Sequence, residues 1–258
     1  MGENILKKIR KLNWVLSEST TGSLSYNDLS RILCEIIGAN VLITNAEGAV
    51  LGSGYANLED ASTVSDEGGS EKLTAFHAQK FIGIKETIEN LYGEACHEIL
   101  GEDYGMTNKY HCIIPSFCGG ERMGTLIVAR YDESFDEVDI ALCEYGATVV
   151  GIEIKRNINL AAEEKKRLIG AVDKAIDKLS FSEKEAVDKI FAEIKGDEGI
   201  LVVSKVAGKY SITNSVIVNA VRKLESAGVL SSQSLGMKGT RIKVINPYLR
   251  QKVEELQL

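Results

Sequence analysis

The chain has 258 residues, of which 44% are hydrophobic and 26% are charged, and it contains only two prolines. This composition excludes a disordered or collagen-like chain and fits one large folded domain or two unequal ones. No stretch is apolar enough to span a bilayer, and the N-terminus lacks the apolar centre of a signal peptide. We therefore expect a cytoplasmic protein with no membrane partner.

Charge is distributed unevenly along the chain. The net charge is −7, yet residues Ile200 to Leu258 hold nine Lys/Arg against three Asp/Glu, a balance of +6. The rest of the chain must then carry −13. A basic end on an acidic body is expected of a separate module that contacts phosphates.

The first fifty residues predict two helices and a hairpin. Apolar residues at helical spacing indicate a helix over Ile5–Leu16 and a second helix that follows Ser25 as its N-cap. Residues 39–54 then predict two strands joined by a turn at Asn45–Gly48.

A variable insert and a second hairpin follow. The segment Tyr55–Asn108 holds eleven Asp/Glu against three Lys, and we expect a helix over about Ala75–Leu91 within it. Two strongly apolar strands come next, joined at Cys118–Glu121, where a Gly-Gly pair permits the positive backbone dihedrals of a tight hairpin.

From about Asp136 to Leu179 the sequence predicts one long helix, or two, docked at the start and exposed at the end. A capping box at Ser182-x-x-Glu185 then restarts helical structure. The order helix, helix, hairpin, insert, hairpin, helix is typical of a GAF-type sensor fold, although PAS domains share much of it.

The segment Val203–Ile245 predicts two helices around a tight turn and a short basic hairpin, the plan of a winged helix-turn-helix. If the second helix begins at Thr213, its apolar residues Ile217, Val221 and Leu224 face the domain core. The opposite face then carries side chains suited to base edges, which are Ser215, Asn219 and Arg222, with Val218 at its border.

Further polar residues flank that face or lie in the hairpin. We expect contacts with the DNA backbone from Asn214, Lys223, Lys238 and Arg241. The alternative is a winged helix used for protein contacts, with Arg222 and Lys223 simply solvated. The local charge of +6 favours DNA.

The segment Ser211–Asn246 closely resembles the DNA-binding segment of the CodY family, pleiotropic repressors of low-GC Gram-positive bacteria. Residues 119–130 and 144–154 are similar to that family's sensor domain and linker. The resemblance implies an α+β chain with a GAF sensor domain (1–155), a linker helix (156–180) and a winged helix-turn-helix (181–258).

The resemblance also implies a function. It indicates a global transcriptional regulator, mainly a repressor, without catalytic residues. Such a protein is a homodimer or higher oligomer and binds operator DNA when isoleucine, leucine or valine, and in many members GTP, are abundant.

Two departures from the family pattern concern arginines. Asn214 stands where the family's recognition helix usually has an arginine. In the best-described members, an arginine after the first hairpin holds the amino-acid carboxylate, but this chain has no arginine between Arg31 and Arg122.

A zwitterionic ligand in an apolar pocket needs its carboxylate paired or hydrogen-bonded. Lys72, the Thr74 hydroxyl or backbone N–H groups could supply the partner, with Phe76 and Phe81 lining the pocket. The alternative makes both phenylalanines core residues of their helix and leaves Lys72 exposed to solvent.

Other chemistries have weaker support. No Gly-x4-Gly-Lys-Ser/Thr loop is present, so GTP would bind without one. The pairs Cys96-His97 and His111-Cys112, with Cys118 nearby, lack the spacing of a metal site, and neighbours on a strand point to opposite faces. We therefore expect free thiols and no metal site.

Two alternative functions remain open. A GAF-based thiol redox enzyme needs a thiol of low pKa, but no cationic environment is apparent around Cys96 in its acidic segment. The other alternative is a DNA-binding protein that responds to no effector.

Overall fold

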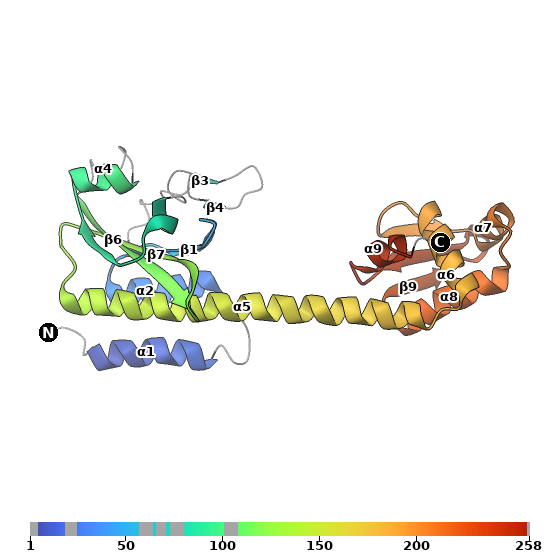
Figure 1. Ribbon diagram of the computed structural model, residues 1–258, viewed down its shortest axis with the longest axis horizontal. Coiled ribbons are helices and arrows are strands. Elements are labelled where there is room, and N and C mark those ends of the chain that lie inside the picture. Colours follow the sequence, from blue (N-terminus) through green and yellow to red (C-terminus); the bar gives the residue numbers. More distant parts are fainter. Residues whose placement is uncertain are drawn as a thin grey trace. The chain divides into compact units, whose positions relative to one another are not determined.

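The computed structural model describes residues 5–18, 25–56, 64–65, 71–72, 80–100 and 108–256 (Figure 1). The chain divides into two compact units, Met1–Asn159 and Leu160–Leu258. Unit 1 carries thirteen Lys/Arg against 24 Asp/Glu, whereas unit 2 carries seventeen against thirteen. The basic residues are therefore concentrated in the C-terminal unit. Within the described ranges, no helix has the length and apolar character needed to cross a bilayer.

Unit 1 is built on a five-stranded antiparallel sheet of order β2-β1-β7-β6-β5. The strands are β1 (Asn40–Asn45), β2 (Val50–Gly54), β5 (Ile88–Leu91), β6 (Lys109–Cys118) and β7 (Glu121–Tyr131). One face is covered by α2 (Tyr26–Ile37) and the first part of α5 (Glu137–Asp177), and α1 (Ile5–Glu18) packs on the side of these helices away from the sheet (Figure 1). The short strands β3 (Val64–Ser65) and β4 (Glu71–Lys72) pair with each other.

The alternation of side chains on the central strands gives unit 1 two apolar layers. Cys112 and Ile114 of β6 face the helices and join the larger core. Ile113 lies between them and points to the other face, where a second buried cluster forms. That cluster, here called the small core, consists of Phe81, Leu91, Cys96, Ile113 and Ile127.

Both predicted hairpins of unit 1 are confirmed, and so is the cap of α2. The Ser25 hydroxyl accepts a hydrogen bond from the Asn27 N–H at 3.2 Å, which satisfies one of the free donors of the first turn. Gly38 ends the helix at φ +72°, a conformation that is costly for other residues.

The helix predicted over about Ala75–Leu91 is wrong for its second half. Residues 80–83 are helical, but Ile88–Leu91 forms β5 and pairs with β6. Pairing satisfies the backbone of this segment while Leu91 is buried in the small core, so tertiary packing overrides helical spacing. Residues 75–79 lie outside the described ranges. Helix α4 (Glu94–Leu100) follows β5.

Helix α5 is a single helix of 41 residues, which resolves the choice between one helix and two. Its first turns pack in the larger core of unit 1, and residues 158–167 are exposed. The expectation that its end is exposed is wrong. Val172, Ala175 and Ile176 are buried in the core of unit 2, so the last turns belong to that unit.

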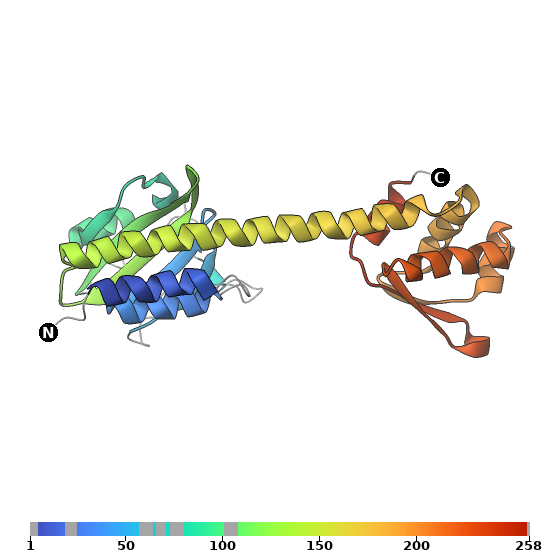
Figure 2. The ribbon, with the colours of Figure 1, turned by 90° about the horizontal axis from the view of Figure 1, so that it is seen from below.

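Unit 2 is a winged helix-turn-helix with a three-stranded sheet of order β8-β10-β9. Its helices are α6 (Phe181–Glu193), α7 (Val203–Tyr210), α8 (Asn214–Ser226) and α9 (Leu249–Glu254). Its strands are β8 (Glu198–Leu201), β9 (Leu230–Ser234) and β10 (Thr240–Val244). Figure 2 shows the β9–β10 hairpin projecting from the helices. Its tip is a short 3-10 turn, η3 (Gly236–Lys238).

The capping box of α6 lies two residues earlier than predicted. The Ser180 hydroxyl accepts from the Glu183 N–H at 3.3 Å, and the Glu183 carboxylate accepts from the Ser180 N–H at 2.7 Å. The serine-to-glutamate spacing occurs in both frames. A second bond to Glu183, from Lys223 on α8, selects the earlier one.

Candidate nucleic-acid interface and sensor face

Helix α8 has one buried and one exposed face, as its spacing predicted. Ile217, Val221 and Leu224 are buried in the core of unit 2, together with Ala220. Thr213 is the N-cap, as the prediction required. The opposite face presents three exposed polar side chains, with Val218 half-buried beside them, and these three are Ser215, Asn219 and Arg222.

Local backbone geometry positions this face. Ser211 ends α7 at φ +56°, and the Ile212 N–H bonds to the Ala207 carbonyl at 3.1 Å, which makes the tight turn between the helices. At the far end of α8, Gly228 has φ +72° and its N–H donates to the Glu225 backbone carbonyl at 2.8 Å. Both ends of the helix are thereby fixed on the core.

Two of the predicted phosphate contacts already have partners within unit 2. The Lys223 ammonium lies 2.6 Å from a Glu183 carboxylate oxygen and 3.2 Å from the Lys178 carbonyl. Arg241 lies in β10, with its Nε 2.6 Å from a Glu198 carboxylate oxygen. The carboxylates offset both charges, so these residues have less positive charge to offer than the sequence suggested.

Lys238 and Asn214 differ from that pair. Lys238 is exposed at the tip of the hairpin in η3, next to the fully exposed Met237. Asn214 is exposed on the first turn of α8. The structure thus presents one wing-tip cation and one amide beside the Ser215, Asn219 and Arg222 face.

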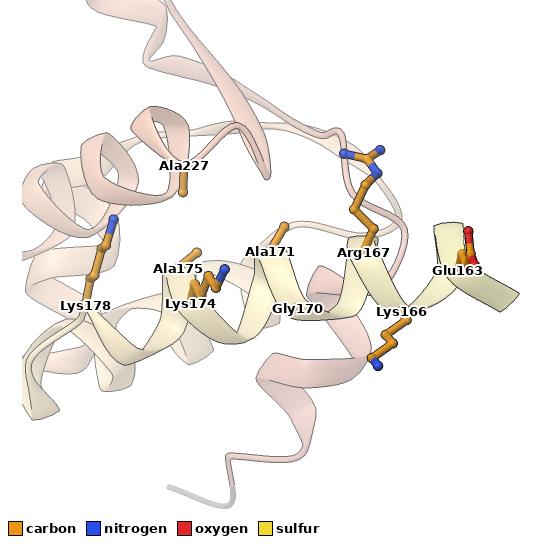
Figure 3. Close-up of a pocket in the computed structure, with 9 residues that line it drawn as sticks. All are labelled: Glu163, Lys166, Arg167, Gly170, Ala171, Lys174, Ala175, Lys178 and Ala227. Carbon is orange, nitrogen blue, oxygen red and sulfur yellow. The ribbon is translucent and has the colours of Figure 1, made fainter. Parts of the chain in front are cut away.

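An open groove that sequence analysis did not identify lies beside the last turns of α5 (Figure 3). Its lining includes the small residues Gly170, Ala171 and Ala175 of α5 and, across from them, Ala227 at the end of α8 (Figure 3). Its rim carries one carboxylate and four cations, which are Glu163, Lys166, Arg167, Lys174 and Lys178. Arg167 is paired with Glu164 at 2.6 Å. The remaining excess of cations attracts anions to this side of the DNA-binding unit.

The four predicted effector residues are only partly within the described ranges. Lys72 lies in β4, but its side chain is outside the description, as are Thr74 and Phe76. Phe81 is 4% exposed and buried in the small core. The predicted core role is therefore correct for Phe81, although its helix is shorter than expected.

Arg122 is the polar residue of this face that sequence analysis missed. Its Nε donates to the Gly124 carbonyl at 2.7 Å, and its Nη2 donates to the Phe81 carbonyl at 3.0 Å and the Thr125 hydroxyl at 2.9 Å. Its Nη1 donates to the Ile84 carbonyl. Burial lowers the pKa of the guanidinium. This side chain joins residues 81–84 to the start of β7.

One cysteine and one histidine meet beside the small core. The Cys96 Sγ lies 3.8 Å from the His111 Nδ1, a neighbour that the sequence pattern did not predict. Burial nevertheless raises the pKa of Cys96, and it raises the pKa of Cys112 to about 11. Thiols with raised pKa values stay protonated near neutral pH, which disfavours thiol catalysis.

The side-chain directions on β6 also bear on whether His111 and Cys112 could bind one metal ion. Cys112 faces the larger core while His111 lies beside Cys96, as alternation along β6 requires. The described part of the chain contains no group of three His, Cys, Asp or Glu side chains placed to hold a metal ion. All five cysteines are free thiols.

A helix-covered antiparallel sheet followed by a winged helix-turn-helix defines a two-domain transcription regulator. A family model described as the CodY GAF-like domain matches residues 4–178, and one described as the CodY helix-turn-helix domain matches residues 197–257. The chain therefore belongs to the CodY family.

Relatives support this over the full length. The chain is 42% identical to the global transcriptional regulator CodY of Clostridium tetani, covering 98% of this chain and 99% of the relative. It is 41% identical to the regulator of the same name from Clostridium acetobutylicum over the same shares. The chain is thus a transcription regulator with a DNA-binding helix-turn-helix domain.

A solved structure is also similar to part of the chain. The cofactor-binding GAF domain of the nutrient sensor CodY from Clostridium difficile is 38% identical, with a TM-score of 0.49. The match covers 60% of this chain and 99% of the other.

Proposed function

We propose that this protein is mainly a repressor, and that a branched-chain amino acid bound to unit 1 sets its affinity for operator DNA. The observation that carries the DNA part is the exposed face of α8. Ser215, Asn219 and Arg222 lie together there on a helix whose other face is buried.

These side chains match the chemistry of base edges. Arginine forks onto guanine and asparagine onto adenine, and each good bidentate contact discriminates by about 1–3 kcal/mol. Lys238 at the tip of the hairpin is suited to a neighbouring phosphate. Lys223 and Arg241 would have to exchange their carboxylate partners to make such contacts.

We further propose that the protein acts in the cytoplasm as a homodimer. A symmetric pair of winged helices reads two half-sites of a palindrome, which explains how one short helix could reach the specificity of an operator. An effector would shift a pre-existing equilibrium toward the dimer geometry that fits both half-sites.

Support for an amino-acid effector comes from the small core. Phe81, Leu91, Ile113 and Ile127 form an apolar layer on the sheet face opposite α2 and α5. Sites for small ligands are lined mostly by apolar side chains, and a layer of this kind suits the aliphatic side chain of isoleucine, leucine or valine. GTP is proposed as a second effector on the family resemblance alone.

Fluorescence anisotropy on an AT-rich palindromic duplex tests the DNA part. We expect binding that weakens steeply between 50 and 200 mM salt, because phosphate contacts release counterions. A non-palindromic duplex of equal length is the control. Binding that ignores both salt and sequence would refute the proposal.

Titrating the same complex with effectors tests regulation. We expect isoleucine, leucine or valine to tighten operator binding, with D-isoleucine as the matched control and GTP added separately. An operator affinity that none of these ligands changes would leave an effector-independent DNA-binding protein. Calorimetry on the full chain then identifies which ligand binds.

A further inference from the structure

We propose that Arg122 is the residue that binds the effector's carboxylate, at the edge of the small core. This inference rests on the proposed function, since it takes the effector to be an amino acid. Three features of the structure support it: the direction of the side chain, the composition of its partners, and its position relative to Phe81.

A β-bulge directs Arg122 toward the small core. The ladder pairs Ser116 with Gly124 but Phe117 with Arg122, which leaves Met123 as an extra residue. Met123 is buried in the larger core, on the helix-covered face. Strict alternation would have put Arg122 on that face, so the extra residue turns the guanidinium to the face of Ile127.

Among the described residues, the groups that contact the Arg122 guanidinium are neutral, including the Phe117 ring, whose centroid lies 5.4 Å away. Its four hydrogen bonds go to three backbone carbonyls and the Thr125 hydroxyl, and among the described residues no carboxylate pairs with it. A half-buried guanidinium surrounded by neutral oxygens gains most from an anionic partner. A carboxylate adds the attraction of opposite charges and can accept two parallel hydrogen bonds from the guanidinium, so it can displace the carbonyls.

Phe81 links the charged and apolar parts of the proposed site. Its carbonyl accepts from Arg122 Nη2, while its ring is buried against Leu91, Ile113 and Ile127. A ligand whose carboxylate replaces this carbonyl therefore has its own side chain beside the apolar layer. A branched aliphatic α-amino acid has this arrangement, with a carboxylate one carbon from a hydrocarbon group.

Calorimetry with isoleucine and isoleucinamide tests the assignment, because the amide has nearly the same shape but no negatively charged carboxylate. With the unchanged protein we expect isoleucine to bind roughly 10- to 100-fold more tightly, the size of a charge-assisted hydrogen bond. Arg122→Gln should lower isoleucine binding to that of the amide, so that the ratio falls to about one. Arg122→Lys, which keeps the charge but loses the fork, should retain part of the ratio.

One control variant and three contrary results complete the test of Arg122. Arg130→Gln alters an arginine of the same strand that is paired with Asp139 and should leave the ratio unchanged. If Arg122→Gln and Arg122→Lys weaken both ligands equally, Arg122 only holds residues 81–84 and the assignment is wrong. If the unchanged protein binds isoleucine without discriminating against the amide, only the assignment fails. If it binds neither, the amino-acid effector itself is wrong.

Discussion

The proposed DNA-contacting face of α8 and the proposed effector site around Arg122 are built in different ways. Ser215, Asn219 and Arg222 come from one helix, and their common face follows from the helical period. Arg122 reaches its face through a bulge and bonds to residues 81–84, some forty positions earlier.

The two regions differ in whether substitutions that change binding also change the stability of the fold. The side chains on the exposed face of α8 can change without loss of the core beneath, because the two faces are separate. Arg122 and Phe81 hold the fold and border the proposed ligand site at once. We therefore expect substitutions in unit 2 to separate binding from folding, and substitutions around the small core to affect both.

The largest effect is expected for Phe81→Ala, which should destabilise unit 1 by about 3–5 kcal/mol because a buried ring is replaced by a cavity. Chemical denaturation followed by circular dichroism should show the transition of unit 1 moving while that of unit 2 stays. Leu224→Ala, in the core of unit 2, is the matched variant, in which the transition of unit 2 should move while that of unit 1 stays. Equal shifts of both transitions would show that the units do not unfold independently.

The next effect concerns specificity. Arg222→Ala should lower the preference for operator over random DNA by about 1–3 kcal/mol, with little change in the free energy of unfolding. Paired anisotropy titrations on the two duplexes measure this preference. Lys252→Ala removes a cation of α9 that is ion-paired with Glu255 and should change neither affinity. An unaltered preference in Arg222→Ala would exclude this residue from base recognition.

A pH dependence is expected from Glu183. The Lys223 ammonium and then the Ser180 N–H lower the pKa of this carboxyl below its ordinary value of 4.5. The ionised form is therefore favoured by folding, and its contribution is present above 4.5 and lost as pH falls through the folded pKa.

Denaturation of Glu183→Gln across pH 3 to 7 measures this. Glutamine can still accept the hydrogen bond of the capping box, but it carries no negative charge for Lys223. The variant should therefore be less stable than the parent at neutral pH, and the two stabilities should converge in acid, where the Glu183 carboxyl is protonated. Ser180→Ala is the comparison variant, since losing the N-cap should cost about 0.5–2 kcal/mol and most of this loss should remain in acid. Parallel curves for Glu183→Gln and the parent would contradict the assigned role.

The smallest effect is expected at the wing. Lys238→Ala should weaken operator and random DNA alike and reduce the slope of log affinity against log salt by about 1, as for one phosphate contact. Arg241→Ala should do less, because Glu198 already pairs with that arginine. A larger loss from Arg241 than from Lys238 would show that the Glu198 pair opens on DNA.

Errors in the sequence predictions occurred where long-range contacts compete with local patterns. The capping box was placed at Ser182 because the serine-to-glutamate spacing occurs twice, and the contact from Lys223 is made forty residues away. Ile88–Leu91 falls within the helix predicted over about Ala75–Leu91, yet it pairs with β6. Neither the position of the capping box nor the pairing of Ile88–Leu91 can be predicted from a few neighbouring residues.

The sequence by itself determined the family, the two-unit order and the residues exposed on α8, because helical and strand periods and turn residues act over short distances. Only the tertiary structure decided that Arg122 turns to the small core, and that Lys223 and Arg241 have carboxylate partners. These contacts join residues that are distant along the chain, and packing alone brings them together. The exposed face of α8 could therefore be predicted from the sequence, whereas the surroundings of Arg122 had to be seen in the fold.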